Sequence, residues 1–217
     1  MKLRQPLYGH TDAVTCLAAS EVHSLIVSGS RDLTCILWDM EELSYITQLA
    51  GHPTSISALA INEKTGEIAS CAGPSLYLWT MKGQLLTRTD TSCGPQADIL
   101  CVGLTQRHEW DARNVIVTGC ADGVVRIWRT EYNRTQLPGP PEEPAPPGLD
   151  GAERDEREQG QDKGWRRRLM LCEELSSGQT QRRCKNNPAI TSLAMSRSHA
   201  TLLVGDAWGR VFTWTCE

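Results

Sequence analysis

Short apolar runs, separated by small and polar residues, recur along the whole chain. Runs such as "VTCLA" (14–18) and "VRIW" (125–128) alternate or stay apolar over the length of one β-strand. Glycine, aspartate and serine lie between the runs, where they favour tight turns. No stretch sustains the period of about 3.6 residues that an amphipathic helix requires. The pattern therefore predicts an all-β chain.

The runs belong to a longer repeat. Two Gly-His pairs, at 9–10 and 51–52, lie 42 residues apart, and two apolar runs end on Trp38 and Trp79, which lie 41 residues apart. Self-similarity at a fixed period is the mark of a repeat architecture. The place of these tryptophans is taken in two further copies by Trp128 and Trp214.

A period of about 40–45 residues, with Gly-His near its start and tryptophan near its end, is typical of WD repeats. Each WD repeat supplies one four-stranded blade of a β-propeller. The sequence thus predicts a partial WD40 β-propeller of about four blades, each with four antiparallel strands. The first three blades are expected at about 8–48, 50–90 and 95–132.

A segment of different composition interrupts the repeat. Trp128 and Trp214 are 86 residues apart, and the excess includes "LPGPPEEPAPPGLDGAERDEREQGQDKG" (137–164), which has six prolines and dense charge. Such a composition predicts a disordered insert over 133–164. Its Pro-rich part also fits an SH3 or WW ligand, as an alternative to a solvated tether. Residues 165–217 are expected to supply the last strand of the third blade and then the fourth repeat.

The polar residues of the copies have an expected structural role. In WD repeats, the Gly-His histidine, a second-strand Ser or Thr, a turn Asp and the third-strand Trp are joined by hydrogen bonds, because a buried Trp N–H and a buried carboxylate both need partners. The first copy supplies the whole network, His10, Ser28, Asp32 and Trp38. The other copies keep part of it: His52, Ser70 and Trp79, then Thr118, Asp122 and Trp128, and finally Trp214.

Ser28, His10 and Asp32 are also the residue types of a hydrolase triad. A triad is recognised by geometry and roles rather than by residue types. Parts of the same set recur in other copies, whereas a catalytic site is not repeated in every blade. The chain also contains no G-x-S-x-G or H-E-x-x-H motif. We therefore expect no catalytic residues and no enzyme, and a Ser/His/Asp hydrolase is the alternative.

Charge, hydrophobicity and cysteine content limit the classes of partner and cofactor that we expect. The net charge of −4 argues against a dedicated binder of nucleic acid. No apolar run approaches the roughly 20 residues that span a bilayer, so direct membrane insertion is not expected. The nine cysteines include no C-x-x-C pair, and several lie in apolar runs. They predict buried, reduced thiols in a cytoplasmic protein, without a metal or another cofactor.

Other proteins are the expected partners, and the turns on the propeller rim are the expected contact points. The candidate partner-binding residues in the turns between second and third strands are Arg31, Ala121 and Trp208. Trp208 is of the type enriched at interface hot spots, with packing against its own strands as the alternative. Four blades leave a ring incomplete, so self-association through open flanks is also expected. The segment 2–7 is a candidate to complete the fourth blade.

Several segments resemble one known family. They are "LYGHTDAVTC", "IVSGSRDLTCILWD", "ALAINEKTGEIASCAG", "EWDARNVIVTGCADGVVRIWR" and "LLVGDAWGRVFTW". Over nearly all of 7–215 the chain is similar to the C-terminal WD repeats of the BEACH-domain family, in its WD-repeat-and-FYVE-domain branch. The resemblance implies a non-catalytic scaffold for membrane traffic, autophagy or endolysosomal sorting, in the cytoplasm and peripheral to membranes through other parts. It also implies a fragment or short isoform, for which the alternative is a fragment without a function of its own.

Overall fold

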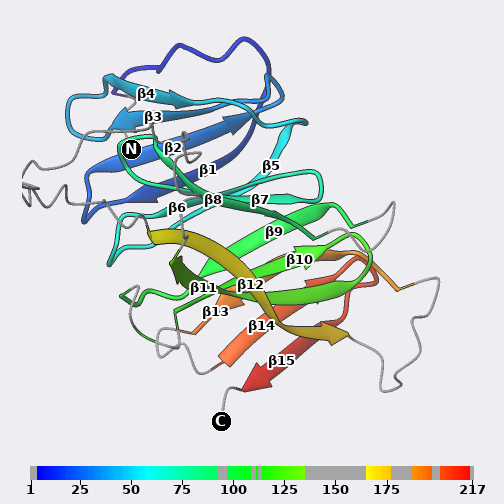
Figure 1. Ribbon diagram of the computed structural model, residues 1–217. Coiled ribbons are helices and arrows are strands. Elements are labelled where there is room, and N and C mark those ends of the chain that lie inside the picture. Colours follow the sequence, from blue (N-terminus) through cyan, green and yellow to red (C-terminus); the bar gives the residue numbers. More distant parts are fainter. Residues whose placement is uncertain are drawn as a thin grey trace, which may run out of the picture.

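The computed structural model describes residues 4–91, 97–108, 111, 114–134, 165–176, 187–196 and 201–215. Every element assigned within these ranges is a β-strand, and the strands form antiparallel sheets that follow one another in chain order (Figure 1). The prediction of an all-β partial propeller is confirmed. No helix in the described part of the chain has the length and apolar character needed to cross a membrane.

Each sheet is a blade whose strands pair in sequence order. The first blade contains β1 (Val14–Ser20), β2 (Leu25–Ser30), β3 (Cys35–Asp39) and β4 (Tyr45–Leu49). The second contains β5 (Ile56–Ile61), β6 (Ile68–Ala72), β7 (Ser75–Trp79) and β8 (Leu85–Asp90). The third contains β9 (Ile99–Leu104), β10 (Val115–Cys120), β11 (Val124–Arg134) and β12 (Trp165–Ser176). The fourth contains β13 (Ile190–Met195), β14 (Thr201–Asp206) and β15 (Val211–Thr215).

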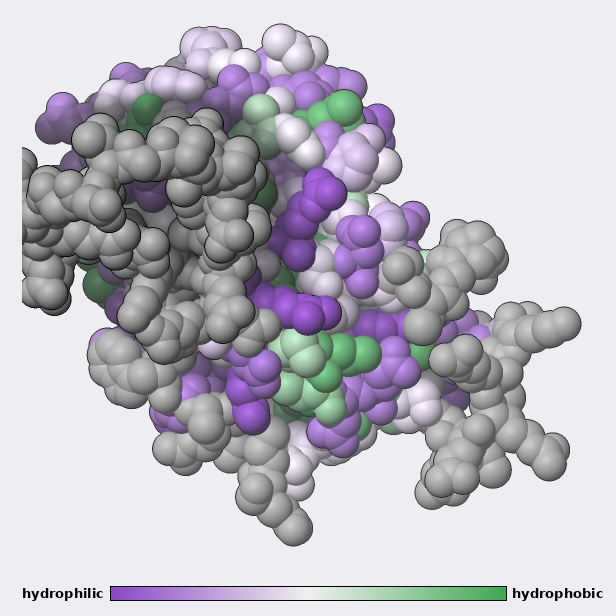
Figure 2. Space-filling view, in the orientation of Figure 1, coloured by the Kyte–Doolittle hydropathy of each residue, from purple (hydrophilic) through white to green (hydrophobic). Residues whose placement is uncertain are grey.

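The blades are held together by their faces. The first strands of consecutive blades, β1, β5, β9 and β13, pack on one another. Successive side chains on a strand point to opposite faces, so a sheet between two others must be apolar on both. The inner strands β6 and β7 meet this requirement, because all of their residues are buried. On the coloured part of the face shown in Figure 2, hydrophobic side chains form small groups among hydrophilic ones.

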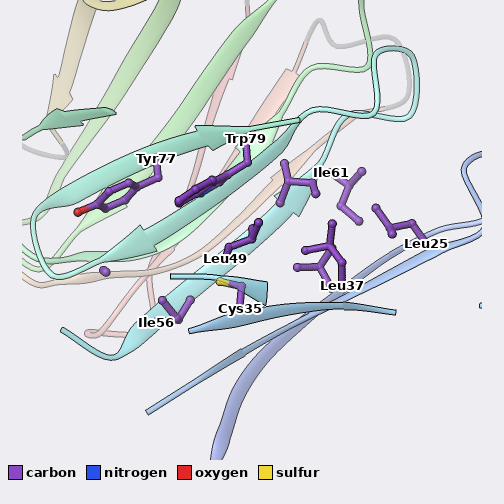
Figure 3. Close-up of a cluster of buried hydrophobic side chains, with 11 residues drawn as sticks. Leu25, Cys35, Leu37, Leu49, Ile56, Ile61, Tyr77 and Trp79 are labelled. Atoms are coloured by element: carbon purple, nitrogen blue, oxygen red, sulfur yellow. The ribbon is translucent and has the colours of Figure 1, made fainter. Parts of the chain in front are cut away.

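The junction between the first two blades shows how the core is filled. Leu25, Cys35, Leu37 and Leu49 of the first blade face Ile56, Ile61, Tyr77 and Trp79 of the second (Figure 3). Two similar clusters lie between the second and third blades and between the third and fourth. Cysteines take part as small apolar residues. Burial raises the pKa of the Cys120 thiol to about 11, so this thiol is protonated and unreactive at neutral pH.

The interruption falls between two long strands of the third blade. β11 extends to Arg134, and β12 begins at Trp165 and pairs with β11 over its whole length. Most of the segment expected to be disordered, residues 135–164, lies outside the described residues.

The N-terminal segment does not complete the fourth sheet of its own chain. That sheet has three strands in the part of the chain that the structure describes. Arg4 and Gln5 instead donate side-chain hydrogen bonds to the carbonyl oxygens of Glu41 and Leu43 in the first blade. The prediction that 2–7 completes the fourth blade is therefore wrong for a single chain. The contacts of Arg4 and Gln5 hold the described part of this segment beside the first blade.

The junction packing leads to a stability prediction. Replacing Ile99, which is fully buried between the second and third blades, by alanine should lower the free energy of unfolding by about 2–5 kcal/mol, because the junction cannot close the cavity. Chemical denaturation measures the change. The matched control is Leu100→Ala, at the exposed neighbouring position of β9, which should change stability by less than about 1 kcal/mol. Equal losses for both variants would contradict the junction model.

Candidate functional site

A chain of hydrogen bonds joins the polar residues of the first blade. The Trp38 indole N–H donates to Ser28 Oγ at 2.8 Å, and Ser28 Oγ lies 2.7 Å from His10 Nε2. His10 Nδ1 lies 2.8 Å from Asp32 Oδ2. β2 supplies the serine, β3 the tryptophan and the turn between them the aspartate. The four residues predicted as a network from the sequence are thus brought together.

The proton positions follow from the chemistry of the partners. A carboxylate accepts hydrogen bonds, so His10 carries its proton on Nδ1 and donates it to Asp32. His10 Nε2 is then the acceptor for the Ser28 hydroxyl, which itself accepts from Trp38. Burial alone raises the pKa of the Asp32 carboxyl, but hydrogen bonds from Thr34, His10 and Thr11 outweigh it and lower the pKa to about 2.

The second blade keeps the tryptophan end of the network and changes the other end. Trp79 donates to Ser70 Oγ at 2.9 Å, and Ser70 Oγ lies 2.9 Å from His52 Nε2. His52 Nδ1 donates to the carbonyl oxygen of Leu33, at 3.2 Å, in the first blade. Burial lowers the pKa of His52, and this hydrogen bond raises it in part. The second network therefore also links two blades.

The third blade replaces the histidine by an arginine. Trp128 donates to Thr118 Oγ1 at 2.9 Å, as in the other blades. Asp122 accepts instead from Arg126, with 2.7 Å between Nη2 and Oδ2, and Arg126 Nε also donates to Glu174 on β12. Burial lowers the pKa of Arg126, but the hydrogen bonds from its guanidinium to Asp122 outweigh this and raise it.

The fourth blade has lost the network. Val204 stands at the register of Ser28, Ser70 and Thr118, so Trp214 has no hydroxyl opposite its indole. The turn aspartate is replaced by Trp208, and Asp206 two residues earlier organises the turn. Asp206 accepts from the backbone N–H groups of Trp208 and Arg210 and from the Arg210 guanidinium. Arg210 and Asp206 form an ion pair that the WD-repeat pattern of the sequence does not predict.

The serine, histidine and aspartate of the first blade have the order of hydrogen bonds of a hydrolase triad. In this structure their surroundings do not allow Ser28 to attack a substrate as a nucleophile. The Ser28 side chain is buried, and its oxygen already accepts the Trp38 N–H, so a substrate carbonyl cannot approach it. The second blade repeats the Ser–His contact with a fully buried Ser70. The arrangement clamps β2 to β3 rather than activating a nucleophile.

The candidate partner-binding residues occupy different environments. Arg31 is exposed and Ala121 is half-buried, and the backbone N–H of each donates to the carbonyl oxygen of the residue just before its own blade's first strand. Trp208 is 64% exposed, with the Arg210 guanidinium 4.9 Å from its ring centre. Arg210 also lies 5.2 Å from the Phe212 ring. Trp208 is thus a solvent-facing aromatic held in place by a cation–π contact.

Several known proteins are similar to this chain in sequence or in structure. Residues 1–39 and 86–129 match the family model "WD domain, G-beta repeat". The chain is 45% identical, over 219 residues, to "WD repeat- and FYVE domain-containing protein 4" from Homo sapiens, covering 100% of this chain and 7% of that protein. It is 29% identical to "BEACH domain-containing protein A2" from Arabidopsis thaliana, covering 99% of this chain and 6% of that protein.

One solved structure extends the comparison to the fold. The crystal structure of the computationally designed Ika4 protein matches with a TM-score of 0.62 at 21% identity, covering 99% of this chain and 100% of that one. At this identity the match supports the fold alone. The chain spans less than a tenth of the length of the two relatives described above.

The first-blade network predicts a stability loss that depends on pH. Asp32→Ala should lower the melting temperature and the free energy of unfolding, by about 1–3 kcal/mol, because His10 and two backbone N–H groups lose their acceptor. The pKa of Asp32 is lower in the folded than in the unfolded chain, so the contribution is full above about pH 4–5 and disappears toward pH 2. Thermal scans across this range measure the difference.

Glu42→Ala, at an exposed carboxylate in the first blade, is the control and should behave as the wild type. A melting temperature for Asp32→Ala equal to that of the wild type at pH 7 would show that the network does not stabilise the first blade.

His52 predicts a second dependence on pH. Its pKa is lower in the folded chain than the value of about 6.5 expected when unfolded, so the unfolded chain binds the proton more tightly. The contribution to stability is therefore present above about pH 6.5 and lost as pH falls. In His52→Gln, which cannot titrate, urea denaturation should show a weaker decline of stability between pH 7 and pH 5. The same decline in both proteins would rule out this origin.

Proposed function

This chain belongs to the WD-repeat regions of BEACH-domain proteins, in the WD repeat- and FYVE domain-containing branch, and from that premise we propose that it is a non-catalytic protein-interaction module of a larger scaffold. Its polar clusters support this role, because the polar groups of the first two blades bond to one another inside the blades. Among the described residues, the side chains left for contact with a partner lie on the turns and on the outer faces of the end blades.

The observation that carries the proposal is the exposed indole of Trp208. In the first and third blades the same turn position holds Asp32 and Asp122, which bond inward. In the fourth blade the position holds an aromatic that faces solvent in place of a carboxylate that bonds inward. Tryptophan and arginine are the residues most enriched at interface hot spots, and Arg210 lies beside this ring.

The cellular setting of the proposal comes from the family. Membrane traffic, autophagy or endolysosomal sorting are the processes that the resemblance to BEACH-domain proteins implies. We place the module in the cytoplasm, peripheral to endosomal or autophagic membranes through other parts of the scaffold or through its partners. No nucleic acid, cofactor or metal is part of the proposal.

Affinity purification tests the rim site. The tagged chain is expressed in cells, and its bound proteins are measured by quantitative mass spectrometry for the wild type, Trp208→Ala and Tyr8→Ala. A hot-spot truncation costs about 2 kcal/mol or more, so Trp208→Ala should reduce recovery of the rim partners by about tenfold or more. Tyr8→Ala, which truncates an exposed aromatic in front of the first blade, should leave their recovery unchanged.

Circular dichroism must show that Trp208→Ala keeps the β-sheet spectrum of the wild type. Equal recovery of every specific partner by a folded Trp208→Ala would remove the rim site, and absence of any specific partner of the wild type would argue against the interaction module itself.

A further inference from the structure

The junction between two blades has the same central contact each time. The first strand of one blade places an isoleucine against a glycine or a cysteine on the second strand of the preceding blade. A β-carbon on Gly29 would lie 2.6 Å from Cγ2 of Ile56, and one on Gly119 would lie 2.5 Å from Cγ2 of Ile190. The missing side chain is thus a socket that the next blade fills. The middle junction has Cys71 and Ile99 at these positions.

A hydroxyl on the first strand bridges each of the first two junctions. Thr15 Oγ1 lies within hydrogen-bond distance of the Gly29 carbonyl oxygen in its own blade, at 3.0 Å, and of the Ile56 carbonyl oxygen in the next, at 2.6 Å. One junction later, Ser57 Oγ lies 2.6 Å from the carbonyl oxygen of Ile99. An isoleucine, its socket and a bridging hydroxyl therefore define a complete contact between blades.

The first blade carries one half of such a contact on its outer face. Val14 holds the register of Ile56, since each pairs with the last residue of its blade's second strand. Ile56 is 1% exposed, whereas Val14 is 51% exposed. Leu17 holds the register of the partly buried Leu59 and is 68% exposed. Val14 and Leu17 form what we call the leading face.

The fourth blade carries the other half. Gly205 holds the register of Gly29, and the nearest atoms to a β-carbon placed there belong to Ser192 of its own blade. The Thr191 hydroxyl lies 3.3 Å from the Gly205 carbonyl oxygen, as Thr15 does from that of Gly29. The socket and the bridging hydroxyl are both present.

Apolar side chains around this socket are uncovered. Val211 holds the register of Cys35 and is 72% exposed, whereas Cys35 is fully buried. Leu203 is exposed at the register of the buried Val27. The trailing face is defined by Thr191, Leu203, Gly205 and Val211.

The segment before β1 lies where the last strand of a preceding blade belongs. Leu7 precedes its Gly-His pair by two residues, as Leu49 of β4 precedes the second pair. β4 of the first blade lies beside the β7–β8 turn of the second, since a β-carbon on Gly83 in that turn would contact Thr47 of β4. Gln5 lies beside the equivalent β3–β4 turn of the first blade, because its side chain donates to the carbonyl oxygen of Leu43. The fourth sheet, meanwhile, has no fourth strand among the described residues.

We propose that a second copy of this chain packs its trailing face on the leading face of the first and receives the reverse contact, which closes a two-fold ring of eight blades. Residues 4–7 of each copy then lie beside β15 of the other and complete its sheet, at an edge where Pro6 is tolerated. The inference rests on the proposed role as an interaction module and names the partner of these two faces.

A second copy is the occupant that uses both ends at once. Among the described residues, each chain has a leading face, a trailing face, an edge of β15 without a neighbouring strand and the segment 4–7. A two-fold axis therefore satisfies all of them with a single partner. Eight blades lie within the range of about four to eight that propellers adopt. Further blades of a longer chain are the competing occupant, and the experiment separates the two.

Sedimentation velocity and light scattering on the purified 217-residue chain give the test. The wild type should have a mass twice 24.0 kDa at micromolar concentration. Leu17→Glu on the leading face and Val211→Glu on the trailing face should each weaken dimerisation about tenfold or more, because a carboxylate would be buried in both junctions. Val22→Glu, 71% exposed in the β1–β2 turn and outside both faces, is the matched control and should dimerise as the wild type.

Mixing the variants makes the test specific. An equimolar mixture of Leu17→Glu and Val211→Glu chains can form a heterodimer with one unaltered junction, so it should dimerise more than either variant alone. A wild type that stays monomeric at about 50 µM would overturn the inference and favour further blades. A dimer that resists both variants, or that Val22→Glu weakens equally, would overturn it as well. A monomer that still captures rim partners through Trp208 would leave the proposed function standing.

Discussion

The protein is held together by the packing of each sheet against the next. A blade with two apolar faces cannot bury them alone, so each face is stable only when a neighbouring blade covers it. Gly29 on β2 and Gly119 on β10 leave space for an isoleucine side chain of the next blade, and Cys71 on β6 packs in the same cluster as Ile99. Stability is therefore distributed along the stack, and the two end blades are the places where it is incomplete.

The polar side chains beside the blade tryptophans are buried in this apolar stack together with their hydrogen-bond partners. The indoles of Trp38, Trp79 and Trp128 each donate to a hydroxyl on the neighbouring strand. Beyond the hydroxyl, the blades use different acceptors and donors. A buried polar group without a partner is costly, so the replacement of one member forces a new partner for the rest. The resemblance of one such set to a catalytic triad follows from this need for pairing.

The proposed contacts with partners use the surfaces that lie outside the junctions and the hydrogen-bond networks. The turns between second and third strands reach solvent, and in the fourth blade one of them presents an aromatic that the interior does not use. The leading face and the trailing face each carry one side of the contact that joins two blades elsewhere in the chain. Both kinds of surface are broad and partly apolar, which suits the contact with another folded protein that we propose.

The sequence by itself determined the strands, the repeat and the first network. Tryptophan recurs at a fixed period, and Gly-His does so in the first two copies, because each copy folds into the same series of strands and turns. Only the tertiary structure decided that His52 bonds to Leu33 of another blade and that Arg126 takes the place of a histidine beside Asp122. It also decided that Arg4 and Gln5 bond to the first blade. These partners are set by which segments meet across a junction, and a contact between distant segments leaves no periodic trace along the chain.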